Sequence, residues 1–172
     1  MNTSYSMVCV CAVILMVIGF LFARPLLSLF GASADAMVYA YPYMMIYLIG
    51  TLPSMVATGM NPFINAQGYS TVGMLSVTIG AVANLLLDPL FIFVFHMGVR
   101  GAALATILSQ AVSAAWVISF LLGKRTVIPV RKKYLRFDWR IIGQVVGLGI
   151  SPFIMQATES LVTITLNSGL QA

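Results

Sequence analysis

Four apolar stretches in this sequence are each long enough to cross a lipid bilayer. They run from Met7 to Leu29, Ala36 to Phe63, Thr71 to Phe95 and Arg100 to Leu122, and a fifth begins near Trp139. About 20 apolar residues in a helix span the hydrocarbon core. Because that core offers no water to backbone groups, such stretches cross it as helices with internal hydrogen bonds. We therefore predict an all-α, polytopic membrane helix bundle.

The composition agrees with a chain that lies mostly within a membrane. Of the 172 residues, 60% are hydrophobic and 8% are charged, whereas soluble domains have about half and about a quarter. No Lys or Arg precedes the first apolar stretch, so we expect it to be a membrane span and not a signal peptide. Cys9 and Cys11 point to different faces of that helix and are predicted to be packing residues.

The basic residues are concentrated in one segment. Seven of the nine Lys and Arg residues lie between Lys124 and Arg140. The positive-inside rule places this segment in the cytoplasm, and counting back through four spans places the N-terminus there too. We therefore expect a multi-pass protein of the cytoplasmic membrane, with no nucleic-acid partner. A role of the segment at anionic lipids or nucleic acid is the alternative to a topology signal.

These features divide the chain into three parts. We expect four transmembrane helices over 1–122, a basic cytoplasmic linker over 123–138 and one further helix within 139–172. Turn-forming residues separate the first four spans at three places, which are 31–35, 65–70 and 97–101. Inside the second span, Pro42 and Pro53 remove backbone hydrogen bonds and predict a bent helix.

The third span contains an amide and a carboxylate on one helix face. Asn84 and Asp88 are four residues apart, and Pro89 has no N–H to donate to the carbonyl of Leu85. An ionisable group at membrane depth is costly and indicates a functional site. Three kinds of oxygen are therefore available to one cation.

A threonine on the next span is predicted at a similar depth. Asp88 lies seven residues before Phe95, about 10 Å along a helix, and Thr106 lies six residues after Arg100, about 9 Å along its helix. Because the two helices are antiparallel, these side chains can meet. The alternative for Asp88 is a structural role, in which it caps a half-helix that restarts at Pro89.

Three segments together resemble the multidrug and toxic compound extrusion (MATE) family. They run from Ala66 to Gly68, from Asn84 to Phe93 and from Met97 to Thr106. The resemblance implies a transporter with twelve helices in two six-helix lobes. This chain would then hold about helices three to seven, with the basic segment as the linker between lobes. The remaining helices, the lipid bilayer and small organic molecules are the implied partners.

The family resemblance also assigns roles to individual residues. In cation-coupled members an Asn and an Asp on the fifth helix and a Thr on the sixth bind Na⁺ or H⁺, and these carry over to Asn84, Asp88 and Thr106. Glu159 lies where some relatives place an acidic residue facing the second lobe's cavity, with a structural or interfacial role as the alternative. His96 is expected to be an interfacial side chain, with a proton relay as its alternative.

The expected function is therefore that of a cation-coupled antiporter for drugs or organic cations, with no cofactor besides the coupling ion. Two alternatives remain open. A lipid-linked sugar flippase of similar architecture would need Arg or Lys in its cavity, and a truncated, non-transporting membrane subunit would use Asp88 only as a helix cap. An enzyme is not expected, because paired catalytic groups at one depth are not evident in the spans.

Overall fold

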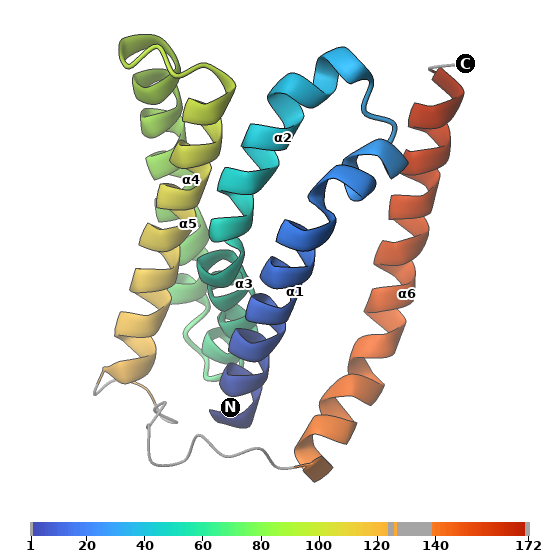
Figure 1. The fold of residues 1–172 in the computed structure, drawn as a ribbon. Coiled ribbons are helices and arrows are strands. Elements are labelled where there is room, and N and C mark those ends of the chain that lie inside the picture. The colour runs from blue at the N-terminus through green and yellow to red at the C-terminus, as the bar shows by residue number, and fades with distance from the viewer. Residues whose placement is uncertain (1, 124–125, 127–138, 171–172) are drawn as a thin grey trace.

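The structure, a computed structural model, describes residues 2–123, 126 and 139–170, and the described residues form helices and their connections (Figure 1). In chain order the elements are α1 (Asn2–Leu29), α2 (Ala34–Ile49), α3 (Thr51–Ala66), α4 (Ser70–Pro89), the π-helical turn η1 (Leu90–Val94), α5 (Val99–Leu122) and α6 (Trp139–Leu170). The predicted all-α fold is confirmed.

The apolar stretches predicted from the sequence correspond to these elements. By length and composition, four segments can each cross a membrane: α1, α4 continued by η1, α5, and the part of α6 from Ile142 to Leu166. The second predicted span is a pair of helices, α2 and α3, that meet at an angle of 55°. Counting this pair as one bent span gives the five predicted crossings.

The bend between α2 and α3 lies at Gly50. The Gly50 amide donates to the carbonyl of Tyr47 at 2.9 Å, a tighter turn than the α-helical pattern. Pro53 has no N–H to offer the carbonyl of Ile49, so the helical ladder is interrupted here. A Cβ atom at Gly50 would lie 2.7 Å from Cγ1 of Ile107 in α5. The absence of a side chain therefore lets the bend pack closely against α5.

Two further spans contain irregular turns beside prolines. In α1, Phe22 has non-helical φ and ψ of −110° and 18°, three residues before Pro25. After Pro89, the amide of Phe95 donates to the carbonyl of Leu90 at 3.0 Å, which closes the π-helical turn. Both irregularities lie in the part of the bundle that contains η1.

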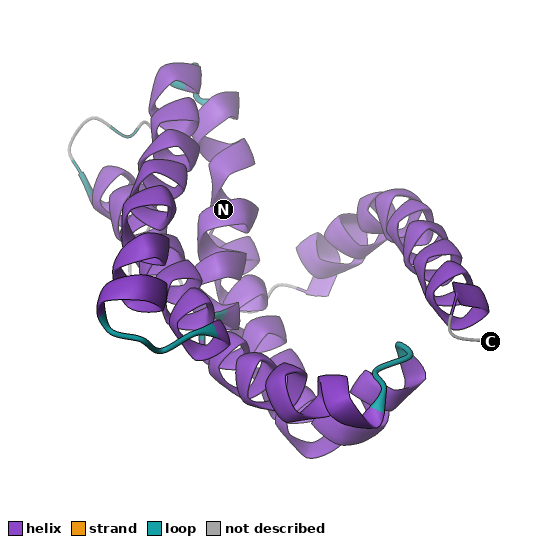
Figure 2. Ribbon diagram, turned by 90° about the horizontal axis from the view of Figure 1, so that it is seen from above, coloured by secondary structure: helices purple, strands orange, loops and turns teal. Residues whose placement is uncertain are grey.

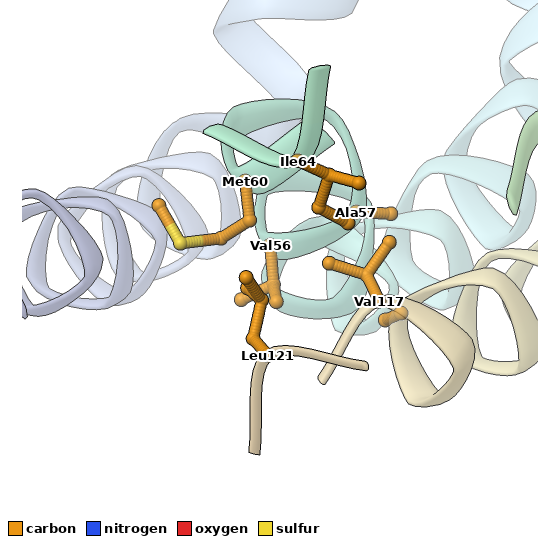
Figure 3. Packing of buried hydrophobic residues seen from close by; sticks show 7 residues of the cluster. Val56, Ala57, Met60, Ile64, Val117 and Leu121 are labelled. Atoms are coloured by element: carbon orange, nitrogen blue, oxygen red, sulfur yellow. The ribbon is translucent and has the colours of Figure 1, made fainter. Parts of the chain in front are cut away.

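The hydrophobic core lies between α3 and α5 (Figure 3). The side chains that form it are fully or almost fully buried, namely Val56, Ala57, Met60 and Ile64 of α3 and Ala114, Val117 and Leu121 of α5. Tyr69, just before α4, packs edge-on against Phe120 with 5.1 Å between ring centroids. These contacts anchor α3 and α5 to each other and hold the start of α4 against them.

The ends of the helices alternate between two ends of the bundle. Figure 1 shows the N-terminus, the α3–α4 connection, the end of α5 and the start of α6 at one end, which we call the linker end. The α1–α2 and η1–α5 connections lie at the other, the η1 end. The N-terminus and the end of α5 thus lie at the same end of the bundle, and their side of the membrane stays a prediction. The linker itself, apart from Gly123 and Thr126, lies outside the described residues, so the three-part division stays a prediction.

Helix α6 stands apart from the other five helices, which Figure 2 shows from above. Among the other elements its contacts are mainly with α1. Most of its described side chains are exposed, including Leu148, Phe153 and Met155. An apolar helix that is exposed on most sides requires lipid or further helices around it.

Candidate functional site

A polar cavity of about 310 Å³ lies between α3, α4 and α5. Its lining comprises Ala57, Thr58 and Asn61 of α3, Val77, Gly80, Ala81 and Asn84 of α4, and Thr106, Ser109, Gln110 and Ser113 of α5. Seven of these eleven residues carry an uncharged polar side chain, although the helices are otherwise strongly apolar. Polar groups in a membrane interior gather where they have a function or a partner.

Two of the predicted site residues, Asn84 and Thr106, line this cavity together. The Thr106 hydroxyl donates to the carbonyl of Ala102 at 2.9 Å, so its oxygen remains free to accept a hydrogen bond or a cation. Small residues allow this approach of α4 to α5, since a Cβ at Gly80 would lie 3.3 Å from Cβ of Ser113. The structure thus brings together an amide and a hydroxyl that lie 22 residues apart in the sequence.

Asp88 is not among the residues that line the cavity. It lies one turn beyond Asn84 on α4, toward the η1 end. Two contacts fix the antiparallel register of α4 and α5. Gly80 lies against Ser113, and Gly101 lies 2.8 Å, measured from its ideal Cβ position, from the backbone of Phe91. In this register Thr106 lies level with the turn between Asn84 and Asp88, and Asp88 lies beyond the cavity lining toward the η1 end.

Helix α4 continues without a break through Asp88 and Pro89 and then passes into η1. The predicted alternative, in which Asp88 caps a restarted half-helix, is therefore wrong. A cap residue accepts a hydrogen bond from a backbone N–H, whereas Oδ1 of Asp88 is buried without a hydrogen-bond partner among the described residues. The next residue, Leu90, donates its N–H to the carbonyl of Leu87, and the π-helical turn begins there.

Two of the cavity-lining amides also have a buried polar atom without a hydrogen-bond partner in the described part of the chain. They are Nδ2 of Asn84, one turn from Asp88, and Oδ1 of Asn61, at the linker side of the cavity. Leaving a buried donor or acceptor unpaired costs about 1–3 kcal/mol. Carboxylate, amide and hydroxyl oxygens are the ligands that hard cations prefer. Asp88, Asn84 and Thr106 carry one side-chain oxygen of each of these kinds.

Asn61 holds α3 and α4 together on the linker side of the cavity. Its Nδ2 donates to Oγ of Ser76 at 2.8 Å and to the carbonyl of Gly73 at 3.1 Å. Ser76 Oγ donates to the Gly73 carbonyl at 2.7 Å, and Ser113 Oγ of α5 donates to the carbonyl of Ser76 at 2.8 Å. We call these three side chains, Asn61, Ser76 and Ser113, the amide–hydroxyl network. A Cβ at Gly73 would overlap the side-chain oxygen of Asn61.

Sequence reasoning missed Asn61 and the α5 residues beside Thr106. A signal for them is present in the sequence. Thr106, Ser109, Gln110 and Ser113 recur at helical spacing on one face of an apolar span. Asn61 follows Thr58 by three residues within the second apolar stretch. A search for polar residues at helical spacing within the apolar spans would have found these lining residues of α3 and α5.

Glu159 lies away from the cavity, since no described residue of α6 lines it. Its Oε2 accepts a hydrogen bond from Nε2 of Gln156 at 2.8 Å. It borders an open depression on α6 together with Met155, Thr158, Val162 and Thr163.

His96 lies on the η1–α5 connection with φ of 53° and does not line the cavity either. The described residues hold no group of three or more His, Cys, Asp or Glu suited to a metal ion.

The chain is similar to multidrug transporters along most of its length. It is 31% identical over 117 residues to Protein DETOXIFICATION 42 of Arabidopsis thaliana, covering 67% of this chain and 23% of that protein. It is 25% identical over 158 residues to Multidrug export protein MepA of Staphylococcus haemolyticus, covering 92% of this chain and 35% of that protein. The chain thus spans less than two fifths of the length of these relatives.

Two solved structures share its fold. An inward-facing multidrug resistance MATE family transporter of the MOP superfamily superposes with a TM-score of 0.88 at 24% identity, over 95% of this chain and 38% of that one. A MATE structure in the bent conformation gives a TM-score of 0.86 at 25% identity, over 95% and 37%. Residues 1–90 match the MatE family. The resemblance seen in the sequence is thereby confirmed, and the chain belongs to the MATE family as a multi-pass membrane protein.

Proposed function

We propose that this chain supplies part of a cation-coupled antiporter that exports drugs or organic cations across the cytoplasmic membrane. The observation that carries the proposal is a pair of unpaired buried polar atoms one helical turn apart, Oδ1 of Asp88 and Nδ2 of Asn84, beside a polar three-helix cavity. The name of one relative, Multidrug export protein MepA, supports the substrate class. Because the chain spans only part of its relatives, the helices outside it complete the transporter.

Asp88 is the coupling group in this proposal. As a carboxylate it attracts Na⁺ or H⁺, while the amide oxygen of Asn84 and the hydroxyl of Thr106 supply neutral ligands beside it. The unpaired Nδ2 of Asn84 is a suitable donor for the Asp88 carboxylate one turn away. The two atoms are not bonded to each other in this structure, so in the proposal this hydrogen bond forms when the cation or proton leaves Asp88 and is prevented when it binds.

Exchange requires that the cation bind two arrangements of the helices with different affinity. The irregular turns at Gly50 and Pro89 are places where the helical ladder is already interrupted, so α2 and the η1 end of α4 are the segments expected to move. The amide–hydroxyl network keeps the linker half of α3, α4 and α5 together. Cation binding would then act on the η1 half of the bundle.

The test is ethidium efflux from cells that express the chain together with the helices that its relatives have beyond it. Asp88→Asn is compared with Asp35→Asn, the same chemical change in the first turn of α2, away from the cavity. At matched membrane levels we expect Asp88→Asn to lower gradient-driven efflux at least about tenfold, the loss of about 1.4 kcal/mol of coupling. Asp35→Asn should stay near wild type. Sodium and proton gradients applied separately identify the coupling ion.

Equal efflux in wild type and Asp88→Asn would refute the coupling role. Absence of efflux from every variant, including wild type, would refute export and favour a flippase or a non-transporting subunit. The described residues that line the α3–α5 cavity include no Arg or Lys for a lipid-linked pyrophosphate, which is why drug export is preferred to a flippase.

A further inference from the structure

A second cavity, of about 340 Å³, lies at the η1 end between the first turns of α2 and the η1–α5 connection. It shares no lining residue with the α3–α5 cavity. Its lining comprises Val38, Tyr39 and Pro42 of α2, His96, Met97 and Gly98 of the connection, and Val99 and Arg100 of α5. It is therefore a separate site, and none of its lining residues takes part in the proposed cation coupling.

The polar side of this cavity is basic. Arg100 contributes a guanidinium and His96 an imidazole, and no acidic side chain is among the described residues that line it. Asp35, in the first turn of α2, lies outside the lining. The start of α5 receives no side-chain cap, because Gly98 precedes its first residue. The partial positive charge of that helix start adds to the charge of Arg100.

The other side of the cavity is apolar and faces outward. Val38 and Tyr39 are 68% and 64% exposed, and Pro42 continues the same wall one turn further along α2. The η1–α5 connection joins two segments that can each cross the bilayer, so the cavity lies at a membrane–water interface. A cavity at this level that places apolar side chains next to basic ones matches a phospholipid, whose charged phosphate is joined to acyl chains.

We propose that this cavity binds the phosphate of an anionic phospholipid. The Arg100 guanidinium pairs with the phosphate oxygens in a two-pronged contact, and the His96 ring is the second donor. The first part of the acyl chain lies along Val38 and Tyr39. These exposed side chains need an apolar neighbour at this level, and the bound lipid supplies it. The site ties the start of α2 to the start of α5, and it does so whether or not Asp88 couples transport.

The test uses the purified full chain in detergent micelles that contain phosphatidylglycerol, with retained lipids counted by native mass spectrometry. We expect Arg100→Gln to lower the number of tightly retained phosphatidylglycerol molecules at least about fivefold, as loss of a charge-assisted two-pronged contact predicts. The matched control is Arg24→Gln, which removes the same charge at the same end of the bundle. Arg24 lies over the ring of Tyr41 at 5.1 Å and does not line the cavity. This control should retain as much lipid as the wild type.

Further arms distinguish a bound phospholipid from free phosphate and from a general effect of charge. Phosphatidylcholine should be retained at least about fivefold less than phosphatidylglycerol, and inorganic phosphate at roughly tenfold molar excess over the lipid should not displace it. Arg100→Lys should keep part of the binding, since it preserves the charge. Undiminished retention in Arg100→Gln, equal loss in Arg24→Gln, equal retention of the two lipids or displacement by inorganic phosphate would each overturn the proposal.

Discussion

Three side chains on the linker side of the cavity, the partly buried Asn61 and the buried Ser76 and Ser113, connect three helices through uncharged groups. Asn61 of α3 reaches both Ser76 and the backbone of Gly73 in α4, and Ser113 of α5 reaches the carbonyl of Ser76. Hydrogen bonds between membrane helices contribute about 0.6 kcal/mol each on average and up to about 1.7 kcal/mol. Several of them in one buried cluster therefore make Asn61 an important residue for the stability of this half of the bundle.

Replacement of Asn61 by Ala removes the donor to Ser76 and Gly73. We expect the free energy of unfolding to fall by about 1–2 kcal/mol, measured by denaturant or thermal unfolding of the chain purified in detergent. Thr58→Ala, one turn earlier on α3, is the control, because the exposed Thr58 hydroxyl bonds to the Ser54 carbonyl of its own helix. Equal loss in both variants would show that the network contributes nothing specific.

The bend between α2 and α3 depends on contacts at the level of whole elements. Pro53 interrupts the ladder, while Gly50 lets the bend approach α5 at Ile107. A helix break that is packed this closely against a neighbour has a defined direction, because a side chain at Gly50 would push the two elements apart. The angle of 55° is thus set jointly by the proline in one helix and the close contact with another.

Gly50→Ala places a Cβ 2.7 Å from Cγ1 of Ile107. We expect this overpacking to lower the free energy of unfolding by about 1–3 kcal/mol. Ile107→Ala removes the clashing atom, so the double variant should be more stable than the sum of the two single changes predicts, by at least about 0.5 kcal/mol. Additive effects in this double-mutant cycle, measured by unfolding in detergent, would show that Gly50 does not meet Ile107.

At the scale of the whole molecule, the two ends of the bundle define its orientation in the membrane. The α1–α2 and η1–α5 connections share one end, and the α3–α4 connection lies with the N-terminus at the other. The basic segment that follows α5 places the linker end in the cytoplasm by the positive-inside rule. The orientation remains a prediction, whereas the grouping of the ends is a property of the fold.

Cysteine labelling in intact cells tests this orientation. In a chain whose Cys9 and Cys11 are changed to Ala, we expect Asp35→Cys and Met97→Cys to react with a membrane-impermeant maleimide from outside. Ser70→Cys, at the start of α4, should react only after the membrane is permeabilised. Met97 and Ser70 are both exposed, so accessibility within the fold does not decide the difference between them. The reverse pattern would invert the topology.

The sequence predicted those features that depend on nearby residues. The spans follow from local hydropathy, and the bend in the second span follows from Pro53 and its neighbours. Helical rise in antiparallel neighbours predicted that Asp88 and Thr106 lie at a similar depth, whereas the structure places Asn84 together with Thr106 in the cavity lining. Asp88 outside the cavity lining and the cluster around Asn61 were not predicted, because they depend on how each helix is rotated about its axis. That rotation is set by close contacts such as Gly80 with Ser113, which no single segment encodes.

The amide–hydroxyl network contains no group that gains or loses charge. A membrane potential does work on a charge that moves through it, about 2.3 kcal/mol per elementary charge per 100 mV, and it does none on a neutral cluster. Under the proposed coupling, voltage and pH act on Asp88 and any cation it binds, and the hydrogen bonds of Asn61, Ser76 and Ser113 add no charge to that response. The network on the linker side of the cavity is thus an uncharged framework, and in the proposed coupling the electrical work is done beside it, at Asp88.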